Sequence, residues 1–510
     1  MNMKRLLYVI GVLLVITSCG GTKIEQPDLN PLELKVDKQK LEFTAAGGTL
    51  EFTVSAQYNP NLSPWEKWYT LEKGTWENNR VTVKVTASAN TETKERTGKI
   101  SVVSGDQKLY VEIVQGAGDE TGGGTNTGTV PKPTNNAAWK MARKLGMGWN
   151  LGNHFDAHIN GVSGETLWGN SEATQETFNK IKAAGFETVR IPVTWLGHIG
   201  EAPEYKIEEA WLDRVAEVVG YAEKAGLNVI INMHHDGADS KYWLNIASAA
   251  VNPAVHKQII EQIDAMWTQI AEKFRDKGDW LIFEAFNEIH DGKWGWGANR
   301  TDGGKQYKCL NEWNNAFLAA VRRTGDTRIL GIPAYCTNVD FAIENFELPV
   351  DVVTDRLMVS VHCYDPSDYT LTAKYSEWGH TAASAKKQPG DNEGDLRKVF
   401  VKLYENFVAE GVPVYMGEFG CVNRGTIRQQ AFQQYYLKYF AKLAKDYGVP
   451  AIIWDNGAKG AGNECHAFFD HGTGAYCSSE AEAAIKALLE SYYNDSPEYT
   501  LETIYNGAPK

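Results

Sequence analysis

Two glutamates end apolar stretches of the sequence, and as a pair they have the chemistry to break a glycosidic bond. Glu288 ends the stretch 281–288 (LIFEAFNE), and Glu418 ends the stretch 414–418 (VYMGE). Glycosidic cleavage needs a protonated carboxyl beside the leaving oxygen and an ionised carboxylate near the anomeric carbon, about 5 Å apart for retention and farther apart for inversion. The alternative for each glutamate is a surface ion pair with Lys or Arg. The small residues Gly417 and Gly420, which flank Glu418, favour the catalytic interpretation.

The elements that carry these glutamates alternate between apolar runs and amphipathic helices over residues 137–493. We expect strands at 148–151, 188–193, 229–234, 281–287, 329–332, 357–362, 414–418 and 451–454, and helices that include 171–184, 210–225, 253–275 and 396–410. Strands that are apolar throughout are typical of parallel sheets covered by helices on both faces. Eight such units predict an α/β fold, a closed (β/α)8 TIM barrel. The segment after the first strand has no glycine-rich phosphate loop, which disfavours nucleotide binding.

Polar or stacking side chains stand at the ends of six of these strands. They are Arg190, His234 with His235, Asn287 with Glu288, His362 with Tyr364, Glu418, and Trp454. The carboxyl ends of barrel strands converge at one mouth, where barrel enzymes have their active sites. Strands four and seven face each other across that mouth, so we expect a short gap between Glu288 and Glu418.

The first part of the chain has a different pattern, in which apolar and polar residues alternate in short stretches. These stretches are 41–43, 49–54, 81–86, 99–103 and 109–114, with glycine turns at 47–48 and 104–105. Period-two alternation predicts a small antiparallel, immunoglobulin-like β-sandwich over 32–117. Residues 118–136 are rich in Gly, Thr and Pro, which is typical of a linker. We assign 137–495 to the barrel, 20–31 to an N-terminal tether and 496–510 to a C-terminal tail.

Residues 1–19 have the features of an export signal. Lys4 and Arg5 precede the apolar run 6–16, which is too short to span a bilayer. The sequence ITSC at 16–19 resembles a bacterial lipobox, in which the signal peptide is removed and Cys19 is lipidated. An ordinary secretory signal is the alternative. Because Gly20 and not Asp follows Cys19, we expect export across the inner membrane and a lipid anchor in the outer membrane or at the cell surface.

Composition excludes several partners and cofactors. The chain has 51 Lys and Arg against 64 Asp and Glu, a net charge of −13, and no basic cluster, so nucleic acid is not an expected partner. The sequence His234-His235-Asp236 could suggest a metal, but neighbouring residues of a strand point to opposite faces and no HExxH motif is present. We therefore expect no metal, no cofactor and a monomer. The six cysteines after Cys19 lack CxxC spacing; a Cys465–Cys477 disulfide and buried free thiols both stay open.

Eight short motifs, in the same order, resemble glycoside hydrolase family 5. They are GWNLGN (148–153), WGN (168–170), VRIPVTW (189–195), NMHHD (232–236), FNE (286–288), HCY (362–364), GEFG (417–420) and WDN (454–456). The likeness covers 137–493, and WGN points to the branch that contains endoglucanases, lichenases and xyloglucanases. Ser171 and Cys363 depart from the usual pattern without affecting the chemistry. Residues 43–49, the tryptophans at 65, 68 and 76, and the segments 81–85, 96–98 and 114–116 resemble a BACON domain, whose name suggests carbohydrate binding; a spacer is the favoured interpretation.

The resemblance implies a role for each residue of the rim. Glu288 is expected to be the acid/base, with its pKa held up by the negative nucleophile. Glu418 is the expected nucleophile, kept ionised by Arg190 and a hydrogen bond from Tyr364. His362 would orient Glu288. The expected contacts with the sugar at the cleavage site come from Asn287, His234, His235 and Trp454.

These roles imply a retaining endo-β-1,4-glucanase that acts on cellulose-type glucan, mixed-linkage glucan or xyloglucan, with no choice among the three. A β-mannanase on the same scaffold is one alternative. A non-catalytic polysaccharide-binding lipoprotein of the cell surface is another, although a binder has no need of two carboxylates at one sugar. Trp294 and Trp296 follow the fourth strand and could either line the cleft or pack under their own loop.

Overall fold

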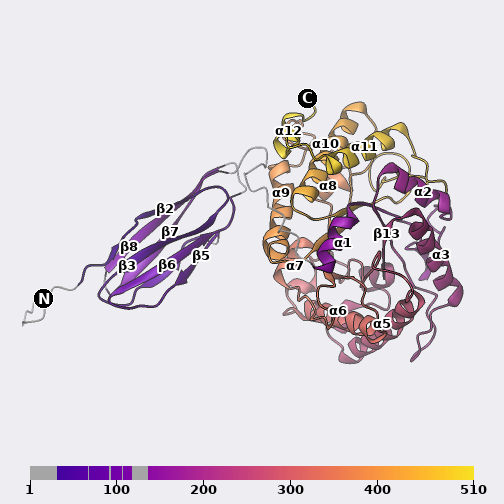
Figure 1. Cartoon of the computed structure of the whole chain (residues 1–510), viewed down its shortest axis with the longest axis horizontal. Helices are drawn as coiled ribbons and strands as arrows, with labels where there is room; N and C mark the ends of the chain where they lie inside the picture. The colour runs from indigo at the N-terminus through magenta and orange to yellow at the C-terminus, as the bar shows by residue number, and fades with distance from the viewer. Residues whose placement is uncertain (1–31, 67, 91–93, 106, 118–135) are drawn as a thin grey trace, which may run out of the picture. The chain divides into compact units, whose positions relative to one another are not determined.

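The computed structural model describes residues 32–66, 68–90, 94–105, 107–117 and 136–510. The export signal with Cys19, the tether and nearly all of the linker lie outside the described residues. The chain forms two compact units, a β-sandwich that ends at Gln115 and a second unit that contains the barrel (Figure 1).

The N-terminal unit consists of two four-stranded sheets. One has the order β1-β3-β6-β5 (Lys35–Val36, Gly48–Ser55, Arg80–Ala87, Tyr69–Lys73), and the other has the order β2-β8-β7-β4 (Lys40–Phe43, Gln107–Gln115, Arg96–Ser104, Asn61–Pro64). Alternate side chains of β6 are buried, because the two sheets pack face to face around one apolar core. The antiparallel prediction is wrong at one pair: β2 and β8 run parallel.

The tryptophans of the sandwich do not all fill its interior. Trp68 and Trp76 pack against the core, whereas Trp65 is 56% exposed. The ring of Trp65 meets the exposed ring of Tyr110 edge to face at 5.4 Å.

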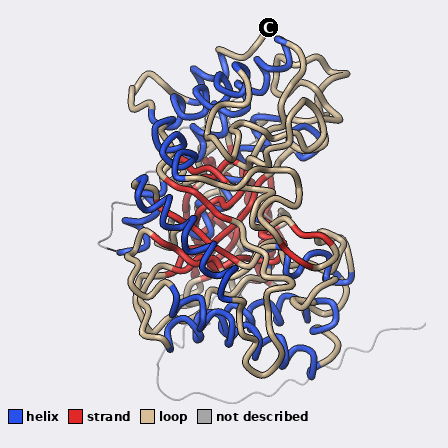
Figure 2. Tube along the Cα trace, turned by 90° about the vertical axis from the view of Figure 1, so that its right-hand side faces the viewer, coloured by secondary structure: helices blue, strands red, loops and turns tan. Residues whose placement is uncertain are grey.

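Eight parallel strands close the barrel, which confirms the predicted architecture. In chain order they are β9 (Met147–Asn150), β12 (Thr188–Ile191), β13 (Asn228–Asn232), β14 (Leu281–Glu284), β15 (Leu330–Asn338), β16 (Leu357–Cys363), β17 (Val414–Phe419) and β18 (Ala451–Ile453), and β18 pairs with β9 to close the circle. Every residue of β12, β14 and β17 is buried. Such strands need a cover on both faces, and Figure 2 shows them at the centre with helices around them.

Helices of varied length surround the barrel. They are α1 (Ala137–Leu145), α2 (Gln175–Ala184), α3 (Glu209–Ala225), α4 (Ile246–Ala249), α5 (Pro253–Lys273), α6 (Lys305–Arg323), α7 (Val339–Glu344), α8 (Ser367–Thr370), α9 (Asn392–Leu403), α10 (Ile427–Asp446), α11 (Ser479–Tyr493) and α12 (Leu501–Asn506). Helix α2 begins four residues later than the expected 171, because Thr174 caps it by accepting the N–H of Thr177. None of the described helices combines the length and apolar character that a membrane crossing needs.

The segment 496–510, expected as a C-terminal tail, packs in part against the barrel. It contains α12, which contacts α10, and Leu501 and Ile504 of α12 are buried with the core residues of the barrel. The six cysteines of the barrel unit are free thiols, so the Cys465–Cys477 disulfide is not formed.

Candidate active site

A cavity of about 360 Å³ opens at the carboxyl ends of the barrel strands. Seven of the nine predicted residues line it: His234, His235, Glu288, His362, Tyr364, Glu418 and Trp454. The other two are buried: Arg190 donates to Glu418 and to Glu284, and Asn287 accepts a hydrogen bond from Arg190. The barrel thus brings together side chains that are up to 264 positions apart in the sequence, from Arg190 to Trp454.

The two glutamates lie close together at this mouth. Glu418 is part of β17, and Glu288 follows β14 with a left-handed backbone (φ +40°). One carboxylate oxygen of each glutamate and one ring nitrogen of His362 all lie within 4.8 Å of one another. Retaining glycosidases hold their two carboxyl groups about 5–5.5 Å apart, and inverting enzymes about 6.5–9.5 Å. The arrangement therefore fits attack by a carboxylate and leaves no room for a free water between the two.

Two donors hold the carboxylate of Glu418. Nη1 of Arg190 donates to its Oε1 at 2.7 Å, and the hydroxyl of Tyr364 donates to its Oε2 at 2.9 Å. Burial raises the pKa of Glu418 above its ordinary value, and the charge of Arg190 and the Tyr364 hydrogen bond oppose the rise. These contacts favour the ionised form, which is the form that a nucleophile needs.

Glu288 has the opposite environment. Its carboxyl contacts Nδ1 of His362 at 2.8 Å, and burial raises its pKa to about 7, with the charge of Arg190 opposing and that of Glu284 adding to the rise. Burial is therefore a larger cause than the charge of the nucleophile, to which the sequence analysis attributed the shift. Burial also lowers the pKa of His362 to about 4, so this ring is neutral near pH 7. A carboxyl that holds its proton near pH 7 can serve as a general acid.

Beneath the two glutamates lies a third, Glu284, which the sequence analysis did not identify as part of the site. It is fully buried and accepts hydrogen bonds from Nη2 of Arg190 (2.6 Å) and from Asn232 (3.0 Å) at one oxygen. At its other oxygen it accepts from Ser360 (3.0 Å) and Tyr415 (2.6 Å). Burial is the largest single influence and raises the pKa of Glu284, but the charge and hydrogen bonds of Arg190, together with the Tyr415 hydrogen bond, more than offset it, so the pKa lies below its ordinary value. Arg190 is thus fixed between two carboxylates.

The signal for Glu284 was present in the sequence. It is the acidic residue inside the apolar run LIFEAF, and a buried carboxylate is costly unless it is paired. Arg190 also donates to Oδ1 of Asn287 at 2.8 Å, so the same guanidinium positions the nucleophile and the amide next to the acid/base.

Comparison with known proteins identifies the fold family of this arrangement. The profile of the cellulases of glycosyl hydrolase family 5 matches residues 150–460, more than half of the chain. The chain belongs to glycosyl hydrolase family 5. A second profile, for the BACON domain, described as a putative N-terminal binding domain, matches residues 63–116.

Individual members of family 5 resemble the chain over most of its length. A xyloglucan-specific endo-β-1,4-glucanase of Bacteroides ovatus is 31% identical over 513 residues, which are 95% of this chain and 96% of that protein. The structure of a broad-specificity endoglucanase from Bacteroides salanitronis is 54% identical, with a TM-score of 0.69, over 71% of this chain and 96% of the other. A Bacteroidetes-affiliated cellulase linked with a polysaccharide utilization locus is 46% identical, with a TM-score of 0.72, over 74% and 99%.

The family 5 motif GWNLGN has a packing reason at Gly152. A side chain at this position would place Cβ 2.7 Å from the ring of Trp454, so only glycine lets that ring lie against the first strand's loop. The ring of Trp454 is parallel to that of His234, with a centroid distance of 6.1 Å. Burial lowers the pKa of His234 and His235, to about 3 for His235, so both rings are neutral hydrogen-bonding groups.

His234 and His235 are not neighbouring residues of a strand, contrary to the prediction. Strand β13 ends at Asn232, so both histidines lie beyond it, and their rings meet edge to face at 4.4 Å. Donor atoms of His234, His235 and Asp156 lie within 4.8 Å of one another. The carboxylate oxygens of Asp156 already accept the backbone N–H groups of Asn153 and His154, which accounts for a buried acid at this place.

The cavity also contains residues that the sequence analysis did not assign to it. Trp294 lines the cavity, is 56% exposed and stacks on His290 at 4.2 Å. Of the two predicted alternatives, Trp294 therefore lines the cleft. Glu464 and Asn338 line it too. Asn338 ends β15 and caps α7, whereas Glu464 comes from the long loop between β18 and α11, whose path is set by packing and not by any local pattern of residues.

Proposed function

We propose that this protein is a retaining endo-β-1,4-glucanase that hydrolyses plant β-glucans by double displacement. The observation that carries the proposal is the pair Glu288 and Glu418, whose carboxylate oxygens lie within 4.8 Å. Membership of family 5 supports the assignment, because the family relatives above bear the names endoglucanase, cellulase and xyloglucanase.

In the first step the carboxyl of Glu288 donates its proton to the glycosidic oxygen while the carboxylate of Glu418 attacks the anomeric carbon. The bond to the leaving sugar breaks, and an ester between Glu418 and the remaining sugar forms. In the second step the ionised Glu288 takes a proton from water, which attacks the same carbon and releases Glu418. During this cycle Glu418 loses and regains its charge, and Arg190 keeps a partner throughout because Glu284 also holds it.

The test compares the parent protein with Glu418→Gln on a soluble β-glucan, with release of reducing ends and viscosity as readouts. We expect a rapid fall in viscosity for the parent, which indicates internal cleavage, and nearly complete loss of activity for the variant. Proton NMR of the first product should show the β-anomer. Equal activity of the two proteins, or an α-anomer as first product, would overturn the proposal.

We propose further that the enzyme accepts both unbranched and branched β-1,4-glucans. Support comes from the 54% identity to an enzyme described as a broad-specificity endoglucanase and from the full-length likeness to a xyloglucan-specific one. Product profiles on carboxymethyl-cellulose, lichenan, tamarind xyloglucan and glucomannan test this. Preference for glucomannan over every glucan would favour the β-mannanase alternative, and binding without products would favour the non-catalytic one.

We also propose that the mature protein is a monomer with a lipid on Cys19, held at the outer membrane or the cell surface with the sandwich as a spacer. The supporting feature is the ITSC sequence that follows the apolar run 6–16. Labelled palmitate should enter the parent protein but not Cys19→Ala, and fractionation should find the parent in the outer membrane. Light scattering of the soluble form should give the mass of one chain.

A further inference from the structure

Among the described residues of the sandwich, four large apolar side chains are exposed to solvent. They are Leu32 (42%), Tyr58 (63%), Trp65 (56%) and Tyr110 (43%). Single exposed apolar side chains are common on soluble proteins, whereas a contiguous group of them marks a surface for a partner. The contacts of these four residues show that they lie close to one another.

Leu32 and Tyr58 lie at the end of the sandwich where the chain enters it. The backbone N–H of Leu32 donates to Oε1 of Gln57 at 3.2 Å, which places Leu32 beside Tyr58. The backbone N–H of Tyr58 donates to Oγ of Ser104 at 3.2 Å. The ring of Tyr58 lies against the turn between β7 and β8, since a Cβ on Gly105 would be 3.2 Å from it. Both exposed side chains therefore adjoin the start of β8.

Tyr110 and Trp65 continue this group along the outer face of the second sheet. Tyr110 is the fourth residue of β8, about 10 Å from the start of the strand, and its ring meets that of Trp65 edge to face at 5.4 Å. The ammonium of Lys108 lies 5.1 Å from the ring centre of Tyr110, and that of Lys99 lies 5.9 Å from the ring centre of Trp65. We name the four apolar side chains and these two lysines the aromatic surface.

The other end of the sandwich has a polar character among the described residues. There Gln115, the last residue of β8, donates to the backbone oxygens of Thr44 at 3.1 Å and Ser88 at 2.8 Å. The aromatic surface thus begins at the end from which residues 20–31 lead back to Cys19.

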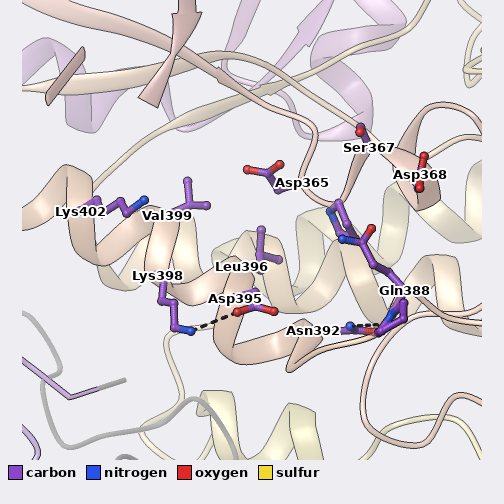
Figure 3. A pocket seen from close by; sticks show the side chains of 12 residues that line it. Asp365, Ser367, Asp368, Gln388, Asn392, Asp395, Leu396, Lys398, Val399 and Lys402 are labelled. Carbon is purple, nitrogen blue, oxygen red and sulfur yellow. Dashed lines mark hydrogen bonds and ion pairs between the residues drawn. The ribbon is translucent and has the colours of Figure 1, made fainter. Parts of the chain in front are cut away.

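A hollow of about 500 Å³ in the barrel unit, between the loop that leads into α8 and helix α9, differs from the aromatic surface. Figure 3 shows Asp395 of α9 paired with Lys398, which lies 3.1 Å away. Leu396 lines the same hollow but is only 1% exposed. Here a charged pair meets the solvent and the apolar side chain is covered, whereas the rings of the aromatic surface are open to a partner.

The chemistry of the aromatic surface fits the head-group layer of a phospholipid bilayer. Tyrosine and tryptophan have an apolar ring with a polar group at its edge, and lysine has an apolar stem with a charged tip, so all three suit a boundary between water and hydrocarbon. A sugar platform is disfavoured, because the ring planes of Trp65 and Tyr110 are inclined by 80° and offer no common flat face. Glu112 lies opposite Lys99 in the strand register, so the charge of the surface is mixed and the rings should provide most of the contact.

We propose that the aromatic surface rests in the head-group layer of the membrane to which the chain is attached. This inference goes beyond the β-glucanase function and rests on the proposed lipid at Cys19. Leu32 is thirteen residues after Cys19, and a segment of this length spans at most about 45 Å, so the sandwich stays close to the bilayer. Because attachment makes the contact intramolecular, a weak interaction is sufficient to keep the surface on the lipid.

The test holds the chain at a bilayer by a route that does not depend on lipidation. Residues 20–510 with an N-terminal His tag are bound to supported bilayers of phosphatidylcholine and phosphatidylglycerol that contain a nickel-chelating lipid. Surface plasmon resonance measures the rate of dissociation in imidazole, and a nickel-chelating polymer without lipid is the reference surface. The variant is Tyr58→Ser/Tyr110→Ser. The matched control, Val350→Ser/Val352→Ser, removes two side chains of the barrel unit that are 92% and 86% exposed.

We expect the parent to leave the bilayer about tenfold more slowly than Tyr58→Ser/Tyr110→Ser. A tenfold change corresponds to about 1.4 kcal/mol and requires burial of only about 60 Å² of apolar surface. Trp65→Ser should change the rate in the same direction, and calorimetric melting shows whether each variant is folded. The control should match the parent on the bilayer, and all the proteins should leave the lipid-free polymer at one rate.

Equal rates for the parent and the tyrosine variant on the bilayer overturn the inference, and so does a difference of the same size on the polymer. Weaker binding of the tyrosine variant to lichenan or xyloglucan in affinity electrophoresis, with an unchanged rate on the bilayer, would assign the surface to sugar instead. None of these readouts needs hydrolysis, so an inactive parent would refute the proposed glucanase function alone. Failure of palmitate labelling would refute the lipid on Cys19 and not the affinity of the surface for a bilayer.

Discussion

We predict that the charge of the buried Glu284 carboxylate raises the pKa of the acid/base Glu288. The substitution Glu284→Gln tests this prediction. The amide has the same shape without the charge. At the oxygen that faces Ser360 and Tyr415 an NH2 group can be accommodated, since both hydroxyls can rotate to accept from it. The other position can keep an oxygen toward Arg190. The substitution therefore removes the charge and preserves most of the hydrogen bonds.

Two effects should follow. Breaking a buried ion pair by removing one partner costs about 3–5 kcal/mol, and the preserved hydrogen bonds place the loss in the free energy of unfolding near the lower end, about 3 kcal/mol. For a unit of this size that lowers Tm by about 5 °C. Because Glu284 raises the pKa of Glu288, the variant should hold the acid proton less tightly. The basic limb of the kcat/KM profile should then move to lower pH, with a loss of activity at pH 7.

The assay is the kcat/KM profile on an aryl cellotrioside between about pH 4 and 9, with calorimetric melting as the second readout. Tyr415→Phe is the matched control, because it removes a hydrogen bond to the same carboxylate and leaves its charge in place. We expect this control to lose about 1–2 kcal/mol of stability and to keep the basic limb of the parent. Superimposable profiles of Glu284→Gln and the parent would refute the electrostatic role. An equally large shift of the basic limb in Tyr415→Phe would mean that packing, and not the charge of Glu284, causes the shift.

Three further outcomes are expected. For the parent enzyme kcat/KM should decline above about pH 7, since burial raises the pKa of Glu288 to about 7 and the acid must be protonated; a flat profile to pH 9 would contradict this role. Glu288→Ala should lose about 10³-fold on glucan but still form the ester from an activated aryl glycoside, and added azide should release the β-glycosyl azide; the α-azide would argue against a covalent intermediate on Glu418. A chain that ends at Asp495 should lose roughly 3–6 kcal/mol of barrel stability, because Leu501 and Ile504 are buried; an unchanged melting temperature would show that α12 contributes nothing.

The barrel could be predicted from sequence because its strands are apolar on both faces and its helices are not. The first and last residues of individual elements were harder to predict. Strand β14 ends at Glu284 and not at Asn287, although the backbone N–H groups of Ala285 and Asn287 still donate to Gly331 and Met233 on either side. Helix α12 has only two buried anchors, Leu501 and Ile504, in a polar surrounding, and the parallel pairing of β2 and β8 leaves no trace in a period-two pattern.

The residues at the mouth of the barrel could also be predicted, because strand ends are recognisable in the sequence and the carboxyl ends of the strands meet in this fold. The hydrogen-bond network of Arg190 beneath the mouth could not be predicted. Which carboxylate Arg190 contacts, and whether burial or a neighbouring charge dominates the pKa of Glu288, depend on distances between strands that no local pattern encodes.

Because β2 and β8 run parallel, the chain enters and leaves the sandwich at opposite ends. Its first described residues lie at one end of the domain, where Leu34 contacts Gln107 at the start of β8, whereas Gln115 at the end of β8 contacts Thr44 at the other end. A domain whose chain enters and leaves at opposite ends separates the segments before and after it by its own length. The nine residues of β8 correspond to roughly 30 Å between these two ends, which is the reach that the sandwich would add if the proposed lipid on Cys19 anchors the chain.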